Sequence, residues 1–432
     1  MIFNLNPIFA LIPLILYVIL SFTELHPVFN VFICVVLSAI LTKQPFASLG
    51  GVIRDSLGSF LGMIGLIIML GAGLGAILQK TGVAEYLVRG LTNRIGVKTE
   101  KRAILTTMFS STILVALLGT LAGANAIIAP IIIPLVAAVG ITPSVVATVF
   151  LGAGLTGMFL GPYTPQVVTI MELTGLDYGT YLYSAGIPLA LVVYLVTFFF
   201  ALYTQKKTLG VYKYEDVELP DEEYVATKET KRAALAFGIS MVAMIAYGIT
   251  LQGGASYAIL VIIVSAILTG VFGGLTISDL IETFIKGAAR LMWLFIMFLL
   301  FNPFIEFIAA AGGFEKLVEY LTPIINSAGK TVFALLSTLT GIFGIGGAAT
   351  ADNIVLDGMF RGIVDNLGVS LGLWALILLI SGQITSFAYP EADMIGQMGL
   401  ARSKDVKSLV KYGLTVVAFS LVLVVIMSFI LG

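Results

Sequence analysis

Two stretches of the sequence place glycine, asparagine and helix-breaking residues inside otherwise apolar sequence. The first is GTLAGANAIIAP, residues 119–130, and the second is GAATADNIVLDG, residues 347–358, which aligns with it without a gap 228 positions later. Glycine permits tight turns, and an asparagine amide both donates and accepts hydrogen bonds. A helix that breaks inside a membrane offers N–H groups to anions and carbonyl groups to cations. The pair therefore predicts two broken helices that bind a substrate or an ion.

A second pair of interruptions follows at the same spacing. GPYTPQ, residues 161–166, and AYPEAD, residues 388–393, each end an apolar run, and Pro162 is in register with Pro390. Proline inside a helix removes a hydrogen bond and leaves a carbonyl group without its donor. These segments predict either a second set of binding groups or ordinary helix ends at the membrane interface.

The two halves of the chain differ in charge at these motifs. Four acids of the second half, namely Asp352, Asp357, Glu391 and Asp393, align with the uncharged Ala124, Ala129, Tyr163 and Pro165. An ionised carboxylate inside a bilayer is costly unless it is paired, solvated or protonated, so these acids are functional candidates. A carboxylate beside a broken helix binds sodium or takes up a proton. Asp352, in the predicted turn itself, is the first choice.

The candidate binding residues are the polar and turn-forming residues of the four motifs. They are Gly123, Asn125, Thr156, Tyr163, Thr164, Thr350, Asp352, Asn353, Asp357, Thr385, Glu391 and Asp393. Asp352 and Asn353 are also the candidates for a sodium site. Each has a structural alternative: the asparagines can cap the second helix of each pair, and Glu391 and Asp393 can lie in interface water. Asp357, Arg361 and Asp365 recur every four residues and can form an ion-pair ladder on one helix face.

Other residue types exclude several classes of function. His26 is the only histidine and Cys34 the only cysteine, so a His-based catalytic triad needs His26, and no paired-cysteine metal site exists. The glycines of GIFGIGGA, residues 341–348, follow no predicted strand, which argues against a nucleotide-binding loop. We therefore expect neither an enzyme nor an organic cofactor. The net charge of −1 gives no indication of a nucleic-acid partner.

The composition predicts the elements that position these motifs. Hydrophobic residues make up 59% of the 432 residues and charged residues 11%, with a mean hydropathy of +1.07. Long apolar runs recur along the whole chain, which predicts an all-α polytopic membrane protein. The predicted spans are 8–22, 27–42, 58–80, 102–118, 124–139, 142–160, 179–203, 233–251, 255–272, 288–310, 330–345, 351–366, 370–388 and 405–431. Segments 46–56 and 278–287 are predicted to be amphipathic interface helices.

The alignment of the motifs predicts an internal repeat. Residues 119–162 and 347–390 are identical at nine of 44 ungapped positions, including Gly119/Gly347, Asn125/Asn353 and Pro162/Pro390. We predict a first half at 1–203, a cytoplasmic connector at 204–232 and a second half at 233–432. Each half would contain about five transmembrane helices and a helical pair that is either re-entrant or fully spanning.

Charge then predicts how the halves are oriented. Both possible numbers of crossings are odd, so the second half is expected to be inverted relative to the first. The loop 80–102 and the connector 204–232 each carry six Lys or Arg residues, whereas the loop 311–329 carries only Lys316. The positive-inside rule places the first two in the cytoplasm and the third outside. Both termini are then expected outside a cell (inner) membrane.

Several stretches resemble a known superfamily. HPVFNVFICVVLSAIL (26–41) and LGSFLGMIGLIIMLGAGLGAILQKTGVAE (57–85) are similar to the start of gluconate permeases. AGANAIIAPIIIPLVAAVGITP (122–143) resembles the hairpin region of the ion transporter superfamily, which includes dicarboxylate carriers and sodium–proton antiporters of the NhaC type. The resemblance implies two inverted repeats with re-entrant hairpins, a homodimer and elevator-like alternating access. It also places the Asn125 and Asn353 regions at hairpin-tip binding sites.

These observations favour a secondary active transporter coupled to sodium or protons. An acid-rich, arginine-poor core favours cation–proton antiport. The alternative is coupled transport of a small carboxylate, such as gluconate or a dicarboxylate, bound by helix N-termini, asparagines and hydroxyl groups. A channel is less favoured, because paired broken helices are typical of alternating access.

Overall fold

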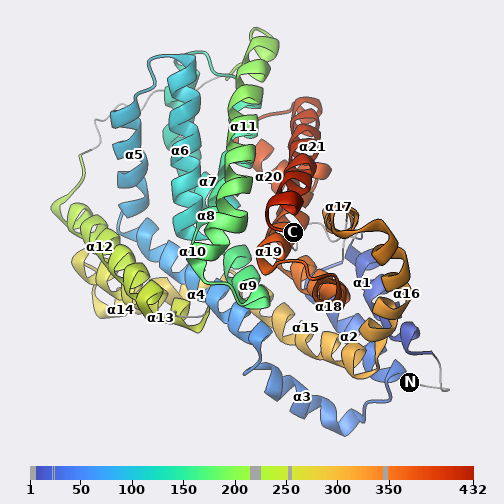
Figure 1. Cartoon of the computed structure of the whole chain (residues 1–432). Coiled ribbons are helices and arrows are strands. Elements are labelled where there is room, and N and C mark those ends of the chain that lie inside the picture. Colours follow the sequence, from blue (N-terminus) through green and yellow to red (C-terminus); the bar gives the residue numbers. More distant parts are fainter. Residues whose placement is uncertain (1–5, 22, 24, 215–224, 252–254, 344–348) are drawn as a thin grey trace.

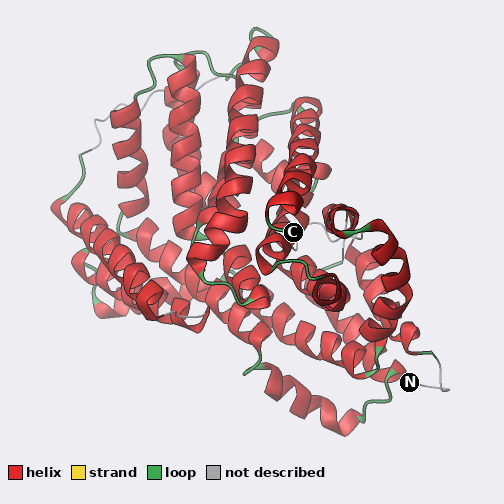
Figure 2. Cartoon of the chain, in the orientation of Figure 1, coloured by secondary structure: helices red, strands yellow, loops and turns green. Residues whose placement is uncertain are grey.

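The structure of the chain is a computed structural model that describes residues 6–432 apart from 22, 24, 215–224, 252–254 and 344–348. Its described residues form helices joined by loops, with no strand among them (Figure 2). Seven of the described helices are long and apolar enough to cross a membrane. The chain is therefore an all-α, multi-pass membrane protein, as its composition predicts.

The helices of the first half are the following (Figure 1): α1 (Ile12–Ser21), α2 (Pro27–Leu41), α3 (Leu49–Ser56), α4 (Phe60–Lys80), α5 (Val83–Ile95), α6 (Glu100–Leu118), α7 (Leu121–Ala137), α8 (Pro143–Leu160), α9 (Pro165–Thr174), α10 (Tyr178–Tyr181) and α11 (Ile187–Thr208). Short turns at Pro7–Leu11 and Phe46–Ser48 precede α1 and α3, and a π turn at Leu182–Gly186 joins α10 to α11.

The helices of the second half are α12 (Lys228–Leu251), α13 (Ala255–Phe272), α14 (Ile277–Ala289), α15 (Met292–Ala310), α16 (Gly313–Ala328), α17 (Lys330–Ile342), α18 (Ala349–Leu367), α19 (Leu371–Ala388), α20 (Ala392–Leu400) and α21 (Val406–Ile430). Every span predicted from the sequence corresponds to a helix in the structure. The predicted helical pairs are α6 with α7 and α17 with α18. Residues 204–208 of the predicted connector form the end of α11, and residues 228–232 form the start of α12.

The segments 80–102 and 311–329, which we expected to be loops, contain helices. α5 and α16 occupy most of them. Both helices carry charged residues, and so they give no long apolar run. In α5, Val83, Ala84, Val88 and Thr92 are buried at helical spacing while Arg94 is exposed. Periodicity identifies such an amphipathic helix where a hydropathy threshold does not.

The helices follow the same order in the two halves, and helices of each half pack against helices of the other. The interrupted helix α9 of the first half packs against α18 and α19, and α20 of the second half packs against α7 and α8 (Figure 1). The centres of the bundle are α8 and α19, whose apolar windows are 94% and 89% buried. Reciprocal contacts of this kind are what a pseudo-two-fold relation between repeats produces.

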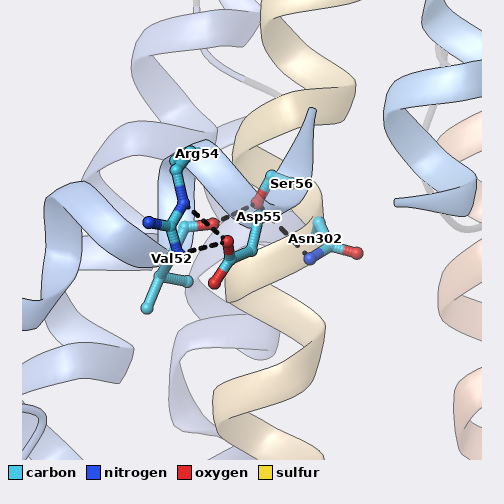
Figure 3. A network of polar contacts seen from close by, with 5 residues as sticks. All are labelled: Val52, Arg54, Asp55, Ser56 and Asn302. Atoms are coloured by element: carbon cyan, nitrogen blue, oxygen red, sulfur yellow. Dashed lines mark hydrogen bonds and ion pairs between the residues drawn. The ribbon is translucent and has the colours of Figure 1, made fainter. Parts of the chain in front are cut away.

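A second reciprocal contact lies away from the broken helices. α3 packs against α15, and α14 packs against α4. Figure 3 shows the polar part of the first contact: Asn302 Nδ2 of α15 donates to Ser56 Oγ at 3.4 Å, and Ser56 Oγ donates to the Val52 carbonyl at 2.9 Å. The neighbouring ion pair of Arg54 and Asp55 is solvent-exposed, so it contributes little to stability.

Candidate functional site

The first predicted break is a sharp turn between α6 and α7. Gly119 ends α6 with a φ of 64°, a left-handed conformation that favours glycine. Thr120 then caps α7, and its hydroxyl accepts from the Gly123 N–H at 3.4 Å. A Cβ on Gly119 would lie 3.8 Å from the Tyr163 carbonyl oxygen and from Thr164 Cα. The two interruptions of the first half therefore meet at one place.

Asn125 is a fully bonded, fully buried residue of α7. Its Oδ1 accepts from Ser111 Oγ at 2.7 Å, and its Nδ2 donates to the Phe150 carbonyl at 3.0 Å and to Gln397 Oε1 at 2.8 Å. These bonds join α7 to α6, to α8 and to α20 of the second half. Asn125 is thus a polar link within the bundle, and helix capping is the work of Thr120.

Asn353 has the same position in α18 and a different environment. Its side chain is fully buried, yet neither Nδ2 nor Oδ1 has a hydrogen-bond partner among the described residues. The predicted turn before α18 falls largely on 344–348, which lie outside the described residues. Thr350 and Asp352 lie with Asn353 in the first two turns of α18 and are buried as well. A buried amide with no partner is costly, so Asn353 remains a candidate binding residue.

Acidic groups collect near this end of α18. Asp352 is only 3% exposed, and both carboxylate oxygens of Glu391 and the hydroxyl group of Tyr389, between α19 and α20, are buried as well. Ser381 and Gln383 of α19 add buried side-chain oxygens that have no hydrogen-bond partner in the described part of the chain. The equivalent positions of the first half, Ala153 and Leu155, are apolar.

Two glycines make room for the two asparagines. A Cβ on Gly154 of α8 would lie 3.0 Å from Asn125 Nδ2, and a Cβ on Gly382 of α19 would lie 2.6 Å from Asn353 Oδ1. These glycines are also 228 positions apart. In both halves, therefore, a glycine lets the crossing helix (α8 or α19) lie close to the helix that carries the asparagine (α7 or α18).

The predicted threonines bond within their own helices or turns. Thr156 donates to the Gly152 carbonyl at 2.9 Å, and Thr385 donates to the Ser381 carbonyl at the same distance. Thr164 donates to the Met158 carbonyl at 2.7 Å. Each of the three hydroxyl groups therefore donates its one hydrogen bond to a backbone carbonyl group, and these bonds stabilise the local helix or turn.

Asp357 belongs to the ion-pair ladder that was the structural alternative. Arg361 lies 3.5 Å from Asp357 and 3.6 Å from Asp365, and Asp357 Oδ1 accepts from Trp374 Nε1 at 2.7 Å. Arg361 also donates to the Leu173 carbonyl of α9 at 3.1 Å. The ladder therefore joins α18 to the first half.

Asp393 lies outside this ladder: its carboxylate accepts a hydrogen bond from Ser386 at 3.0 Å and is partly buried.

Four residues of this region were not among the predicted site residues. Ser111 and Gln397 are the partners of Asn125, and Ser381 and Gln383 lie on the buried helix α19. Their sequence signal is a polar residue inside an apolar run, which is too common in this chain to select them. No group of three His, Cys, Asp or Glu residues that could hold a metal ion occurs within the described segments. A cation bound here would need neutral oxygen ligands as well.

The chain is similar to known transport proteins along most of its length. Residues 5–282 match the family described as CitMHS, citrate transporter. No curated protein sequence matches the chain. The structure of the YdaH transporter of Alcanivorax borkumensis covers 94% of this chain and 98% of its own, with 15% identity and a TM-score of 0.61.

A second structure leads to the same fold. The structure of MtrF of Neisseria gonorrhoeae, which is described as illuminating a class of antimetabolite efflux pumps, covers 96% of this chain and 97% of its own, with 14% identity and a TM-score of 0.59. At these identities the two structures show the fold alone. The family match covers more than half of the chain and is to citrate transporters, so it does not confirm the predicted gluconate permease or NhaC branch. The chain therefore belongs to the citrate transporter family, and it is a membrane transport protein and not an enzyme.

Proposed function

We propose that this protein is a secondary active transporter that moves a small carboxylate of the citrate class together with a coupling cation, sodium or a proton. The citrate transporter family supplies the substrate class. The paired broken helices and reciprocal contacts of α9 and α20 support alternating access between two inverted repeats. The elevator-like movement, the homodimer and the inner-membrane location implied by the superfamily are parts of the same proposal.

The charge of the core carries the cation-coupling part of this proposal. Among the described residues, Asp352 and Asp405 are buried acids, the carboxylate oxygens of Glu391 are buried as well, and no Lys or Arg is buried. A polycarboxylate that enters such a site meets negative charge with no buried basic side chain to pair with it. Like charges in a medium of low dielectric constant repel strongly, so cations must accompany the substrate.

Uptake into proteoliposomes tests this function. Purified protein is reconstituted, and uptake of labelled citrate is measured with an inward sodium gradient, with an inward proton gradient, and with neither. We expect accumulation above the equilibrium level with one gradient only, and competition by unlabelled citrate. Equal entry without a gradient would indicate a channel, and no entry under any condition would reject the substrate class.

Cation–proton antiport is the second candidate function. It is favoured by the buried carboxylate groups of Asp352 and Glu391, which both belong to the second half of the chain. Burial disfavours the charged form of a carboxyl group, so a buried carboxyl group can hold a proton that a cation displaces. A pH dye trapped inside the same proteoliposomes tests it. Sodium or lithium addition without citrate should move protons, and no dye response removes this candidate.

A further inference from the structure

A groove between α12 and α13 lies apart from the residues of the proposed transport site. The two helices coincide with the predicted spans 233–251 and 255–272, and they lie side by side at one edge of the molecule (Figure 1). The groove has a volume of about 490 Å³, within the range of small-ligand pockets, roughly 300–1,000 Å³. Its lining residues are Arg232, Leu235, Ala236, Ile239, Ser240, Ala243 and Met244 of α12, and Val264, Leu268 and Phe272 of α13.

The spacing of the lining residues explains the hollow. Those of α12 recur every three or four positions and those of α13 every four, so each set shares one face of its helix. On α12 the small side chains of Ala236, Ser240 and Ala243 alternate with larger ones. Leu235 and Ile239, which stand beside them, are each more than half exposed. The groove therefore presents apolar side chains to whatever surrounds the molecule.

The floor of the groove has its polar groups already bonded. Ser240 Oγ donates to the Phe237 carbonyl at 3.0 Å and lies 3.3 Å from Ser265 Oγ. The Ser265 hydroxyl group in turn donates to Met241 Sδ at 3.5 Å. A polar ligand would lose its hydration here and find few groups to bond, which is costly, whereas an apolar chain loses nothing. The groove thus suits an apolar ligand.

The two ends of the groove differ. The Tyr257 hydroxyl of α13 donates to the Met244 carbonyl at 2.9 Å. A Cβ on Gly248 would lie 2.6 Å from Tyr257 Cε1, so the Tyr257 ring packs directly against α12. This contact closes the groove beyond Met244. Arg232 lines the opposite end, where α12 begins.

The length of the groove matches one leaflet of a bilayer. Met244 is 12 positions after Arg232. At roughly 1.5 Å per residue, α12 rises about 18 Å between them. The hydrocarbon core of a bilayer is about 30 Å thick, so one leaflet contributes about 15 Å. A groove that starts at the surface where α12 begins therefore ends near the middle of the membrane.

The open end of the groove is basic. Arg232 is exposed and forms no ion pair within the described residues. Lys228 and Lys231 of the same helical turns are exposed as well. The acid among them, Glu229, packs elsewhere: its Cγ would lie 3.5 Å from a Cβ on Gly274. The positive-inside rule places this basic end at the cytoplasmic leaflet, which is the leaflet that carries anionic lipids.

We propose that this groove binds an acyl chain of an anionic phospholipid, with the phosphate of the headgroup at the Arg232 guanidinium group. A guanidinium group donates paired hydrogen bonds to phosphate oxygens. The apolar groove holds the chain, and Arg232 selects the charge of the headgroup. A second copy of the chain fits less well, because a two-fold axis at the groove would set it against the same concave surface. The lipid site is independent of the substrate that is transported.

Lipid retention by the delipidated protein tests the site. The protein in dodecyl maltoside micelles is mixed with phosphatidylglycerol, or with phosphatidylcholine of the same acyl chains, and bound lipids are counted by native mass spectrometry. Arg232→Gln removes the charge at the groove, and Lys231→Gln removes a neighbouring charge that does not line it. Ala243→Phe fills the groove, and Val242→Phe is the control at an exposed position outside the lining.

We expect the unaltered protein to retain phosphatidylglycerol in preference to phosphatidylcholine. Arg232→Gln should lower the affinity for phosphatidylglycerol about fivefold, the effect of one basic side chain at an anionic surface, and leave that for phosphatidylcholine unchanged. Ala243→Phe should reduce the retention of both lipids, because the acyl chain loses its place. Lys231→Gln and Val242→Phe should behave as the unaltered protein does.

Equal retention of the two lipids by the unaltered protein overturns the proposal, and so does an unchanged lipid count in Ala243→Phe. If Ala243→Phe does not fold, Arg232→Gln decides, since it alters an exposed side chain. A loss in Arg232→Gln no greater than in Lys231→Gln then overturns the proposal. Light scattering of the lipid-free proteins examines the other occupant. A dimer that Ala243→Phe breaks and Val242→Phe keeps would show that a second copy covers the groove, which also overturns the lipid site.

Discussion

Asn125 and Asn353 stand at equivalent places in the two repeats, and their surroundings have diverged. Asn125 makes three hydrogen bonds, which reach α6, α8 and α20. Asn353 is equally buried and makes none with the described residues, while Asp352 and Glu391 lie in its half. A duplicated framework thus holds one polar residue as a structural link, whereas the other has no hydrogen-bond partner in the described part of the chain. This break in the repeat symmetry is the reason that the second half is the proposed location of the binding site.

The largest expected effect comes from the charge that only the second half carries. Asp352→Asn should reduce cation-driven citrate uptake by about 100-fold or more, because loss of a buried charged partner costs several kcal/mol of binding energy. Uptake into proteoliposomes measures it. Asp365→Asn, on the exposed end of the ion-pair ladder, is the control and should retain near-normal uptake. Normal coupling in Asp352→Asn would remove this residue from the site.

The two asparagines should respond differently to the same change. Asn125→Ala leaves Ser111 and Gln397 without their partner, so we expect a loss of roughly 2–4 kcal/mol in stability. Asn353→Ala removes a group that has no such partner, so stability should change by less than about 1 kcal/mol while uptake falls. Thermal unfolding in detergent compares them. Equal destabilisation by both changes would contradict the view that Asn125 is a structural link and Asn353 is not.

The two glycines that face the asparagines allow a sharper comparison. In Gly382→Ala the new Cβ would approach Asn353 Oδ1 and the Ala349 carbonyl at 2.6 and 2.7 Å, and the carbonyl is backbone that moves little. In Gly154→Ala the closest atom, at 2.3 Å, is Leu121 Cδ1, the end of a flexible side chain. Overpacking costs about 1–3 kcal/mol, and we place Gly382→Ala at the upper end. The thermal unfolding midpoints and the citrate uptake of both variants are measured, and we expect the larger loss in Gly382→Ala.

The smallest effect is expected at the ladder of Asp357, Arg361 and Asp365. Its ion pairs are long, at 3.5 and 3.6 Å, and Arg361 and Asp365 are partly exposed. Arg361→Gln should lower stability by about 1 kcal/mol or less and leave the cation dependence of uptake unchanged. A changed cation dependence in this variant would place the ladder within the transport site.

Composition and spacing alone determine much of this protein. Apolar runs locate the membrane helices, because the bilayer demands long apolar helices with satisfied backbones. The spacing of 228 residues between Asn125 and Asn353, and between Pro162 and Pro390, is enough to identify the repeat. At the aligned motif positions, acidic residues occur in the second half alone, so the sequence also shows which half carries the negative charge. These features are local or periodic, so a linear sequence is enough to show them.

Only the tertiary structure decided which polar residues bond to one another. The contact of Asn125 with Gln397 joins residues 272 positions apart, and it depends on how α20 crosses α7 and α8. The amphipathic helices α5 and α16 were missed for a related reason, since charged residues interrupt their apolar runs. Burial and pairing are properties of packed helices, and packing depends on contacts between distant parts of the chain.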